Sequence, residues 1–221
     1  GFKLSHEHFR ERTCLRKIAV LGGPLHAREL DAGRSINVVI GSRYGEARER
    51  VAHLTEGAPV AFHPTRDIVG VEVAGAVANV ASLAAGMAEG LGLGDTARGV
   101  LIARGIIESR YLGVALGASS ETFTGLAGLG ELIPSSVTST DRHIEVGRML
   151  ADGARVEDAL ARVDGHVEGI LTAQEAVGRA RALNLELPLI GAVHDVISSA
   201  RAARSALEDI LARPLPLDRS S

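Results

Sequence analysis

Gly70–Arg110 reads GVEVAGAVANVASLAAGMAEGLGLGDTARGVLIARGIIESR, and this stretch decides the fold. Small apolar residues recur at helical spacing as far as Gly90, and a second helical pattern begins at Thr96. We interpret the glycines at 90–94 as a turn between two helices, because a dinucleotide-binding glycine string has to follow a strand. The stretch therefore predicts a pair of closely packed helices.

The composition of the whole chain agrees with a helical core. The 221 residues can form one large domain or one and a half small ones, and 46% of them are hydrophobic but only 3% aromatic, so we expect a core of aliphatic side chains. Lys and Arg total 24 against 27 Asp and Glu, a balance that gives no electrostatic reason to bind nucleic acid. Cys14 is the single cysteine, which excludes an internal disulfide and fits a cytoplasmic location.

The most apolar part of the chain is Val73–Ala88. It covers about 16 residues between two glutamates, fewer than the roughly 20 that a membrane-spanning helix needs. We therefore expect a buried, alanine-rich helix and no membrane span.

Outward from this stretch, the chain divides into two predicted domains. Residues 1–67 are a small α/β piece, with strands expected at Ile18–Leu21, Ile36–Ile40 and Val60–His63 and helices at Ser5–Arg12 and Gly45–Leu54. Residues 68–221 are predicted to be helical throughout. The helical patterns cover Thr65–Leu91, Thr96–Leu116, Glu121–Leu126, Asp141–Ala151, Arg155–Arg162, Glu168–Leu183, Pro188–Ser198 and Ala200–Leu211. The fold class is therefore mostly α.

Several ordered motifs carry a family resemblance. Gly70, Glu72, Gly75, Ala76 and Asn79 match the pattern G-x-E-x-x-G-A-x-K-N, and the chain resembles the NAD(P)-dependent glycerol-3-phosphate dehydrogenases. Further segments that resemble motifs of this family are Gly22–Leu30, Thr122–Ile133 and His166–Ala173.

The resemblance implies a two-domain oxidoreductase. A Rossmann domain would bind NAD or NADP, and a helical domain of the 6-phosphogluconate-dehydrogenase-like type would bind the substrate and supply a homodimer contact. Hydride would pass between the cofactor and C2 of dihydroxyacetone phosphate or glycerol 3-phosphate, while a lysine handles the proton on the C2 oxygen. We expect the Rossmann half to lie upstream of Gly1, so residues 1–67 would be its remnant. This chain alone is then not expected to bind the dinucleotide tightly or to be active.

The sequence departs from the family at the centre of the predicted site. The catalytic lysine falls on Ala78, whose methyl group cannot exchange a proton, so no catalytic residue is predicted. Taken alone, Ala78 is simply a good helix former on a packed face. Leu25 also replaces a serine that contacts the substrate in the family.

The resemblance assigns the remaining site residues by position. The substrate-binding candidates are Gly23, Asn79, Glu131, Ser135, Arg142 and His143, and the cofactor-binding candidates are Ala27, Arg142 and Glu168. Arg142 would grip the substrate phosphate with its planar fork of donors. Three alternatives remain open: Asn79 bonded to backbone, Glu168 as a charge near a helix start, and Arg142 as a solvated charge beside a capping Asp141.

Asp141 and His143 replace the serine and asparagine that flank this arginine in the family. A carboxylate beside a phosphate is unfavourable, since two like charges about 4 Å apart repel by roughly 4 kcal/mol at an effective dielectric constant of about 20. We predict no metal site, because His6 and His8 have no third ligand nearby in the sequence.

Three hypotheses about function follow. The chain is the substrate-side part of a glycerol-3-phosphate dehydrogenase homologue, or it is a non-catalytic relative that binds a ligand or a protein partner. The third hypothesis is a different reaction in the same superfamily, with Glu131 or His143 as the acid or base.

Overall fold

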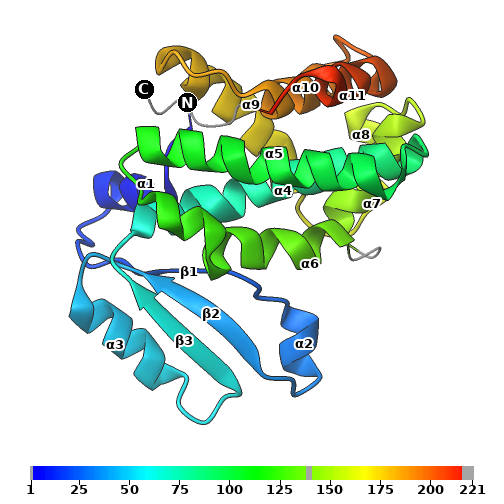
Figure 1. Ribbon diagram of the computed structural model, residues 1–221. Coiled ribbons are helices and arrows are strands. Elements are labelled where there is room, and N and C mark those ends of the chain that lie inside the picture. Colours follow the sequence, from blue (N-terminus) through cyan, green and yellow to red (C-terminus); the bar gives the residue numbers. More distant parts are fainter. Residues whose placement is uncertain (1, 138–140, 216–221) are drawn as a thin grey trace.

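The structure, a computed structural model, describes residues 2–137 and 141–215. A bundle of helices lies on one side of the molecule and a small sheet with short helices on the other (Figure 1). The prediction of a mostly α fold is confirmed.

The α/β piece holds a three-stranded sheet in the order β1-β2-β3, formed by Val20–Gly22, Ile36–Gly41 and Val60–Thr65. β1 pairs antiparallel with β2, while β2 and β3 are parallel and are joined across helix α3, Gly45–Leu54. All three strands were predicted, although β1 begins two residues later than expected. Helix α1 spans Ser5–Arg12 as predicted, whereas the five-residue α2, Ala27–Asp31, was not expected.

Helix α4, Ile68–Gly90, is the centre of the helical part (Figure 1). Asp67 caps its start by accepting a hydrogen bond from Gly70 N at 2.9 Å. The helix has 23 residues, against a predicted pattern over Thr65–Leu91, and its most apolar 18-residue window has a mean hydropathy of 1.8, so by length and composition it could cross a membrane. Burial is the better argument for a core helix, since 78% of its apolar window lies inside the protein.

The other helices pack around α4 or follow it. They are α5 (Gly94–Ala115), the 3₁₀ helix η1 (Ser120–Thr124), the π-helical turn η2 (Leu126–Gly130), α6 (Glu131–Val137), α7 (Arg142–Ala151), α8 (Val156–Leu160), α9 (Glu168–Ala182), α10 (Pro188–Ile197) and α11 (Ala203–Ala212). The glycine-rich turn between α4 and α5 is confirmed, and the part of the chain after Asp67 that the structure describes contains no strand. The α-helix predicted at Glu121–Leu126 was wrong, because η1 and η2 take its place.

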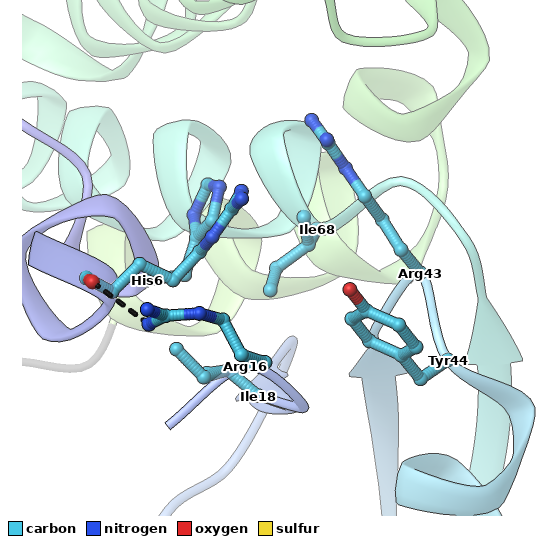
Figure 2. A pocket seen from close by; sticks show the side chains of 7 residues that line it. His6, Arg16, Ile18, Arg43, Tyr44 and Ile68 are labelled. Atoms are coloured by element: carbon cyan, nitrogen blue, oxygen red, sulfur yellow. Dashed lines mark hydrogen bonds between the residues drawn. The ribbon is translucent and has the colours of Figure 1, made fainter. Parts of the chain in front are cut away.

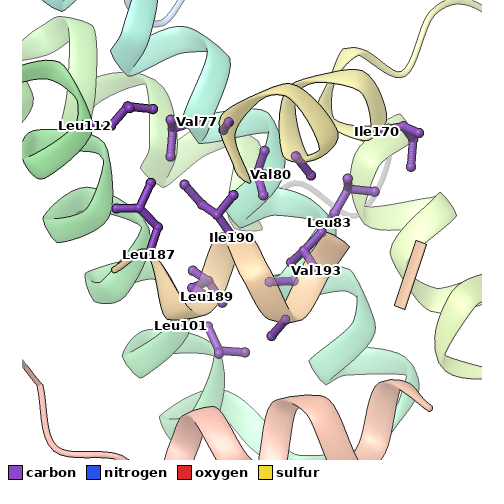
Figure 3. Close-up of a cluster of buried hydrophobic side chains, with 14 of the residues drawn as sticks. Val77, Val80, Leu83, Leu101, Leu112, Ile170, Leu187, Leu189, Ile190 and Val193 are labelled. Atoms are coloured by element: carbon purple, nitrogen blue, oxygen red, sulfur yellow. The ribbon is translucent and has the colours of Figure 1, made fainter. Parts of the chain in front are cut away.

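Glycine residues allow α4 and α7 to pack so closely that their backbones are in contact. A Cβ atom on Gly86 would lie 2.3 Å from Ile144 O, and one on Gly147 would lie 2.3 Å from Leu83 O. On other faces α4 packs aliphatic side chains, among them Val77 and Val80, near residues of α5 and α10 (Figure 3). The aliphatic core predicted from the composition is thus a set of close helix contacts centred on α4.

The predicted division at residues 67 and 68 falls at the start of α4. Segments on both sides of it share contacts: Leu4 belongs to the same core cluster as α4, and a Cβ on Gly22 would meet Val71 at 2.5 Å. The assignment of these two parts as separate domains stays a prediction.

Candidate functional site

Three helices begin close to one another and bring together polar residues that the sequence singled out. Glu131, Arg142 and Glu168 are the first residues of α6, α7 and α9. Helix starts carry unpaired N–H groups and partial positive charge, so polar and acidic side chains are favoured there. We refer to Glu131, Asp141, Arg142, His143 and Glu168 as the polar cluster.

Asp141 is the N-cap of α7. Its carboxylate accepts hydrogen bonds from His143 N at 2.8 Å and from Ile144 N at 3.4 Å. Burial acts to raise the pKa of Asp141, but hydrogen bonds and the charge interaction with His143 outweigh it, so the pKa lies below its ordinary value. The alternative that Asp141 caps a helix is therefore confirmed.

Arg142 faces a carboxylate. Its Nη2 atom lies 3.3 Å from both carboxylate oxygens of Glu168, across 26 residues of sequence. The two side chains remain 44% and 45% exposed, so the pair lies at the surface. Glu168 thus neutralises the guanidinium that the resemblance assigns to a substrate phosphate.

His143 is buried, with 3% of its side chain exposed, and both ring nitrogens are engaged. Nδ1 lies 3.2 Å from Asp141 Oδ1, and Nε2 accepts a hydrogen bond from Gly169 N at 3.4 Å. Nε2 also lies 3.5 Å from Glu168 Oε2. His143 is therefore used to position α7 against α9, which argues against a role as an acid or base.

Glu131 is the carboxylate of the polar cluster that has an oxygen without a hydrogen-bond partner among the described residues. Burial raises its pKa, against the effects of nearby His26 and a hydrogen bond from the Leu25 backbone, and Asp141 adds to the rise. Glu131 Oε2 and His26 Nε2 are both buried, and neither has a hydrogen-bond partner among the described residues. Buried polar atoms without partners are uncommon in proteins, so this pair marks a place where a ligand or water completes the contacts.

His26 is not among the site residues that the sequence predicted. Its position follows from the turn after β1, where Gly23 has φ +88° and a Cβ there would lie 3.2 Å from Leu126 O. Gly23 was predicted as a substrate-binding residue, and the structure gives it a backbone reason to be glycine. The signal that could have found His26 is its place three residues after this glycine.

The remaining candidates differ in what their side chains can still do. Ser135 Oγ donates to Glu131 O at 2.7 Å, within its own helix. Asn79 is half-buried, and its side-chain amide makes no hydrogen bond within residues 2–137 and 141–215, so the alternative of an amide bonded to backbone does not hold. Its backbone carbonyl lies against Gly169 at the start of α9. Ala27 is exposed at the start of α2.

Ala78 lies in apolar surroundings on α4. It is 4% exposed and packs in a small cluster with Ala81 and Leu132. The adjoining cavity measures about 10 Å³, close to what one water molecule needs. Its lining residues are Ala74, Ala78, Gly105, Ile106, Ser109, Phe123, Gly128 and Leu132. None of these lining residues has a titratable side chain.

The dinucleotide-binding features implied by the resemblance do not fit the described residues. A pyrophosphate needs a glycine-rich turn between a strand and a helix. The glycines at 90–94 join helix α4 to helix α5, and the Glu168 carboxylate faces Arg142. The residues that the structure describes therefore do not form a glycine-rich dinucleotide site.

Known proteins of similar sequence carry the family name that the motifs imply. A relative from Burkholderia lata, described as glycerol-3-phosphate dehydrogenase [NAD(P)+], is 43% identical over 195 residues, which is 88% of this chain and 58% of the relative. A relative of the same description from Rhodospirillum rubrum is 38% identical over 204 residues, covering 92% of this chain and 58% of that protein. The chain thus spans less than two thirds of the length of these relatives.

The crystal structure of glycerol-3-phosphate dehydrogenase from Coxiella burnetii superposes with a TM-score of 0.91 at 29% identity, over 96% of this chain and 65% of that chain. The yeast enzyme GPD1 gives 0.81 at 20% identity, which supports the fold alone.

Fold and site together define the class, a helical domain of dehydrogenase type with a short α/β segment before it. The family model described as NAD-dependent glycerol-3-phosphate dehydrogenase C-terminus matches residues 67–208, and the chain belongs to this family.

Proposed function

We propose that this chain is the substrate-side part of a glycerol-3-phosphate dehydrogenase-like protein that keeps a ligand-binding polar cluster and lacks lysine-dependent proton transfer. The observation that carries the proposal is Ala78, which the motif places at the catalytic lysine and which lies among side chains that do not titrate. Reduction of a ketone requires a proton donor at the oxygen, and a methyl group cannot supply one.

The charges of the polar cluster support the same proposal. The cluster holds three carboxylates, those of Glu131, Asp141 and Glu168, and a single guanidinium, that of Arg142, which pairs with Glu168. A phosphate dianion brought to Arg142 has to displace Glu168 and is repelled by the carboxylates that remain. We infer weak binding of glycerol 3-phosphate and a preference for ligands with fewer negative charges.

NAD or NADP enters the proposal only through the relatives, whose names state dependence on NAD(P)+. When bound, such a cofactor supplies the hydride. Among the residues that the structure describes, Asn79 and Glu131 would contact the ligand. The Asn79 amide and the unpartnered Glu131 carboxylate oxygen can each form a hydrogen bond with a polar group. We expect no tight binding of NAD or NADP by this chain alone, and we propose a cytoplasmic protein.

The test measures turnover by the gene product that contains this chain. NADH and NADPH oxidation are followed with dihydroxyacetone phosphate as substrate, in the natural protein and in Ala78→Lys. We expect no turnover above background in the natural protein. The matched control is Ala78→Met, which has a similar length but no amine, and circular dichroism checks that each variant folds. Clear turnover by the natural protein would contradict the proposal.

A second candidate function rests on Glu131. A buried carboxyl with a raised pKa and an unpartnered oxygen is suited to accept or donate a proton. The protein would then carry out a related reaction with Glu131 as acid or base. Turnover of a carbonyl compound that is abolished in Glu131→Gln and retained in His143→Gln would favour this function over the first.

A further inference from the structure

A second cavity, of about 70 Å³, lies where α1, the connection from β2 to α3 and the start of α4 meet (Figure 2). Its lining residues are His6, Arg10, Arg16, Ile18, Arg43, Tyr44 and Ile68, which we call the arginine pocket. None of them belongs to the polar cluster. Ile68 lies about 16 Å along α4 from Asn79, at 1.5 Å per residue, and the Asn79 carbonyl lies against Gly169, the neighbour of Glu168, so the pocket and the polar cluster are distinct.

The cationic side chains of the arginine pocket come from separate segments and are not neutralised. Arg10 and Arg43 are exposed, and their guanidinium groups make no ion pair or hydrogen bond with any described residue. Arg16 is held in place, because its Nη1 atom donates to the carbonyl oxygens at the end of α1 and just beyond it. Figure 2 shows Arg43 and His6 on opposite sides of Ile68, with Arg16 beside Ile18.

Two carboxylates close to lining residues already have partners. Glu72 accepts hydrogen bonds from the backbone N of His6 at 2.9 Å and meets His6 Nδ1 at 2.5 Å. Glu46, on the first turn of α3, pairs with Lys17 at 2.6 Å. The pocket therefore has an excess of positive charge, which an anion would offset.

The volume and the lining residues of the arginine pocket limit the kinds of ligand that it can bind. A volume of about 70 Å³ holds about five water-sized groups, and a phosphate group has about that number of heavy atoms. Guanidinium forks pair with phosphate oxygens through two parallel hydrogen bonds. Ile18, Ile68 and the ring of Tyr44 add apolar walls beside the charges, which suits an organic substituent on the phosphate.

We propose that the arginine pocket binds the phosphate group of a small phosphorylated molecule. The site is separate from the polar cluster, and the proposal does not depend on the function proposed above.

Isothermal titration calorimetry tests this with inorganic phosphate and phenyl phosphate, at constant ionic strength because salt screens exposed charges. We expect saturable binding of both probes by the gene product that contains this chain, with phenyl phosphate the tighter. Arg10→Gln and Arg43→Gln should each weaken binding by about tenfold, as expected for the loss of a charge-assisted hydrogen bond. Equal affinities for the two probes would assign the pocket to free phosphate.

Two variants separate this site from non-specific attraction. Arg181→Gln removes an equal charge from an exposed position on α9, and Arg142→Gln removes the guanidinium of the polar cluster. Arg181→Gln should bind the probes as the natural protein does, and Arg142→Gln should keep the binding that Arg10→Gln and Arg43→Gln weaken, losing at most the weak binding at the polar cluster. Equal weakening by Arg181→Gln, or binding that disappears only in Arg142→Gln, would overturn the proposal, as would the absence of saturable binding at millimolar probe. Thermal unfolding should be unchanged in all four variants, since these side chains are at least partly exposed.

Discussion

Glu168 and Arg142 form the contact that sets the charge of the polar cluster. In the family motif, Arg142 corresponds to an arginine that grips a phosphate, yet here its guanidinium lies 3.3 Å from both oxygens of a carboxylate. An internal carboxylate and an incoming phosphate compete for the same donors. The affinity for anionic ligands therefore depends on one side chain that can be changed.

Glu168→Gln should raise the affinity for glycerol 3-phosphate. The exposed pair contributes at most about 1 kcal/mol, so the expected gain is roughly threefold to fivefold by calorimetry. Arg142→Gln is the opposite control and should lower the affinity. Unchanged affinity in Glu168→Gln would mean that Glu168 does not hold Arg142 away from ligands.

Glu108 is a buried carboxyl with a structural role. Its two oxygens accept hydrogen bonds from Leu189 N at 2.7 Å and Ile190 N at 3.0 Å, so a residue of α5 satisfies the first turn of α10. Burial raises the pKa of Glu108 to about 7, against the opposing effects of these hydrogen bonds and of Arg104.

This raised pKa predicts a pH-dependent stability. Between the ordinary value of 4.5 and about 7, the folded protein binds more protons at this site than the unfolded chain does. The free energy of unfolding should therefore be highest at acidic pH and fall as the pH rises through about 7, by up to roughly 3 kcal/mol. Urea denaturation from about pH 5 to about pH 8 measures this slope. Glu108→Gln should flatten it, and a slope that persists in this variant would assign the effect to another group.

Among the elements, α7 depends on its first turn. Asp141→Ala removes the side chain that accepts from His143 N and Ile144 N, so the free energy of unfolding should fall by about 1 kcal/mol. Asp141→Asn keeps a capping oxygen and serves as the control. If the alanine and asparagine variants have the same denaturation midpoint, the cap does not stabilise the helix.

The crossing of α4 and α7 depends on glycine. Gly147→Ala would bring a methyl group within 2.3 Å of Leu83 O, against backbone, and should destabilise the protein by about 3 kcal/mol or more. Gly178→Ala in α9 is the matched control, because a Cβ there meets nothing within 4 Å. That variant should gain up to about 1 kcal/mol from helix propensity. Similar thermal midpoints for the two variants would contradict this account.

Long elements could be predicted from the sequence, and short ones could not. The hydrophobic periodicity of α4 and α5 extends over 22 residues or more, which is long enough to outweigh the conformational preferences of single residues. The three strands could be predicted because turn residues bound them. α2 and α6 contain only five and seven residues, and α6 includes Pro134, which a sequence pattern does not favour inside a helix. The π-helical turn η2 depends on tertiary packing, for a Cβ on Gly128 would meet Phe123 O at 2.1 Å.

The candidate site, too, could be predicted only in part from the sequence. Motif positions located Glu131, Arg142 and Glu168, which begin three different helices. The pairing of Arg142 with Glu168, and the placement of His26 beside Glu131, join segments far apart in sequence. Spacing alone does not show which donors a neighbouring carboxylate already occupies.

For the whole molecule, self-association remains a prediction. Leu54, Leu171 and Ile133 are exposed by 74%, 61% and 49%, and the net charge of −3 gives little electrostatic opposition to contact between copies. We expect a dimer of the gene product by light scattering at increasing concentration. A monomer over the whole concentration range would contradict this.

Helix α4 touches α5, α6, α7, α9 and the sheet, so its amide hydrogens should exchange with solvent only when the whole domain opens. At a buried position on such a helix, the space between neighbouring helices limits the size of the side chain. Alanine is small and has a high helix propensity, so it fits there readily. An alanine at position 78, where the resemblance predicts a lysine, therefore costs the fold little. A helix of this kind can keep its packing whatever residue a reaction requires there, so the stability of the scaffold and the chemistry of its site are separable properties.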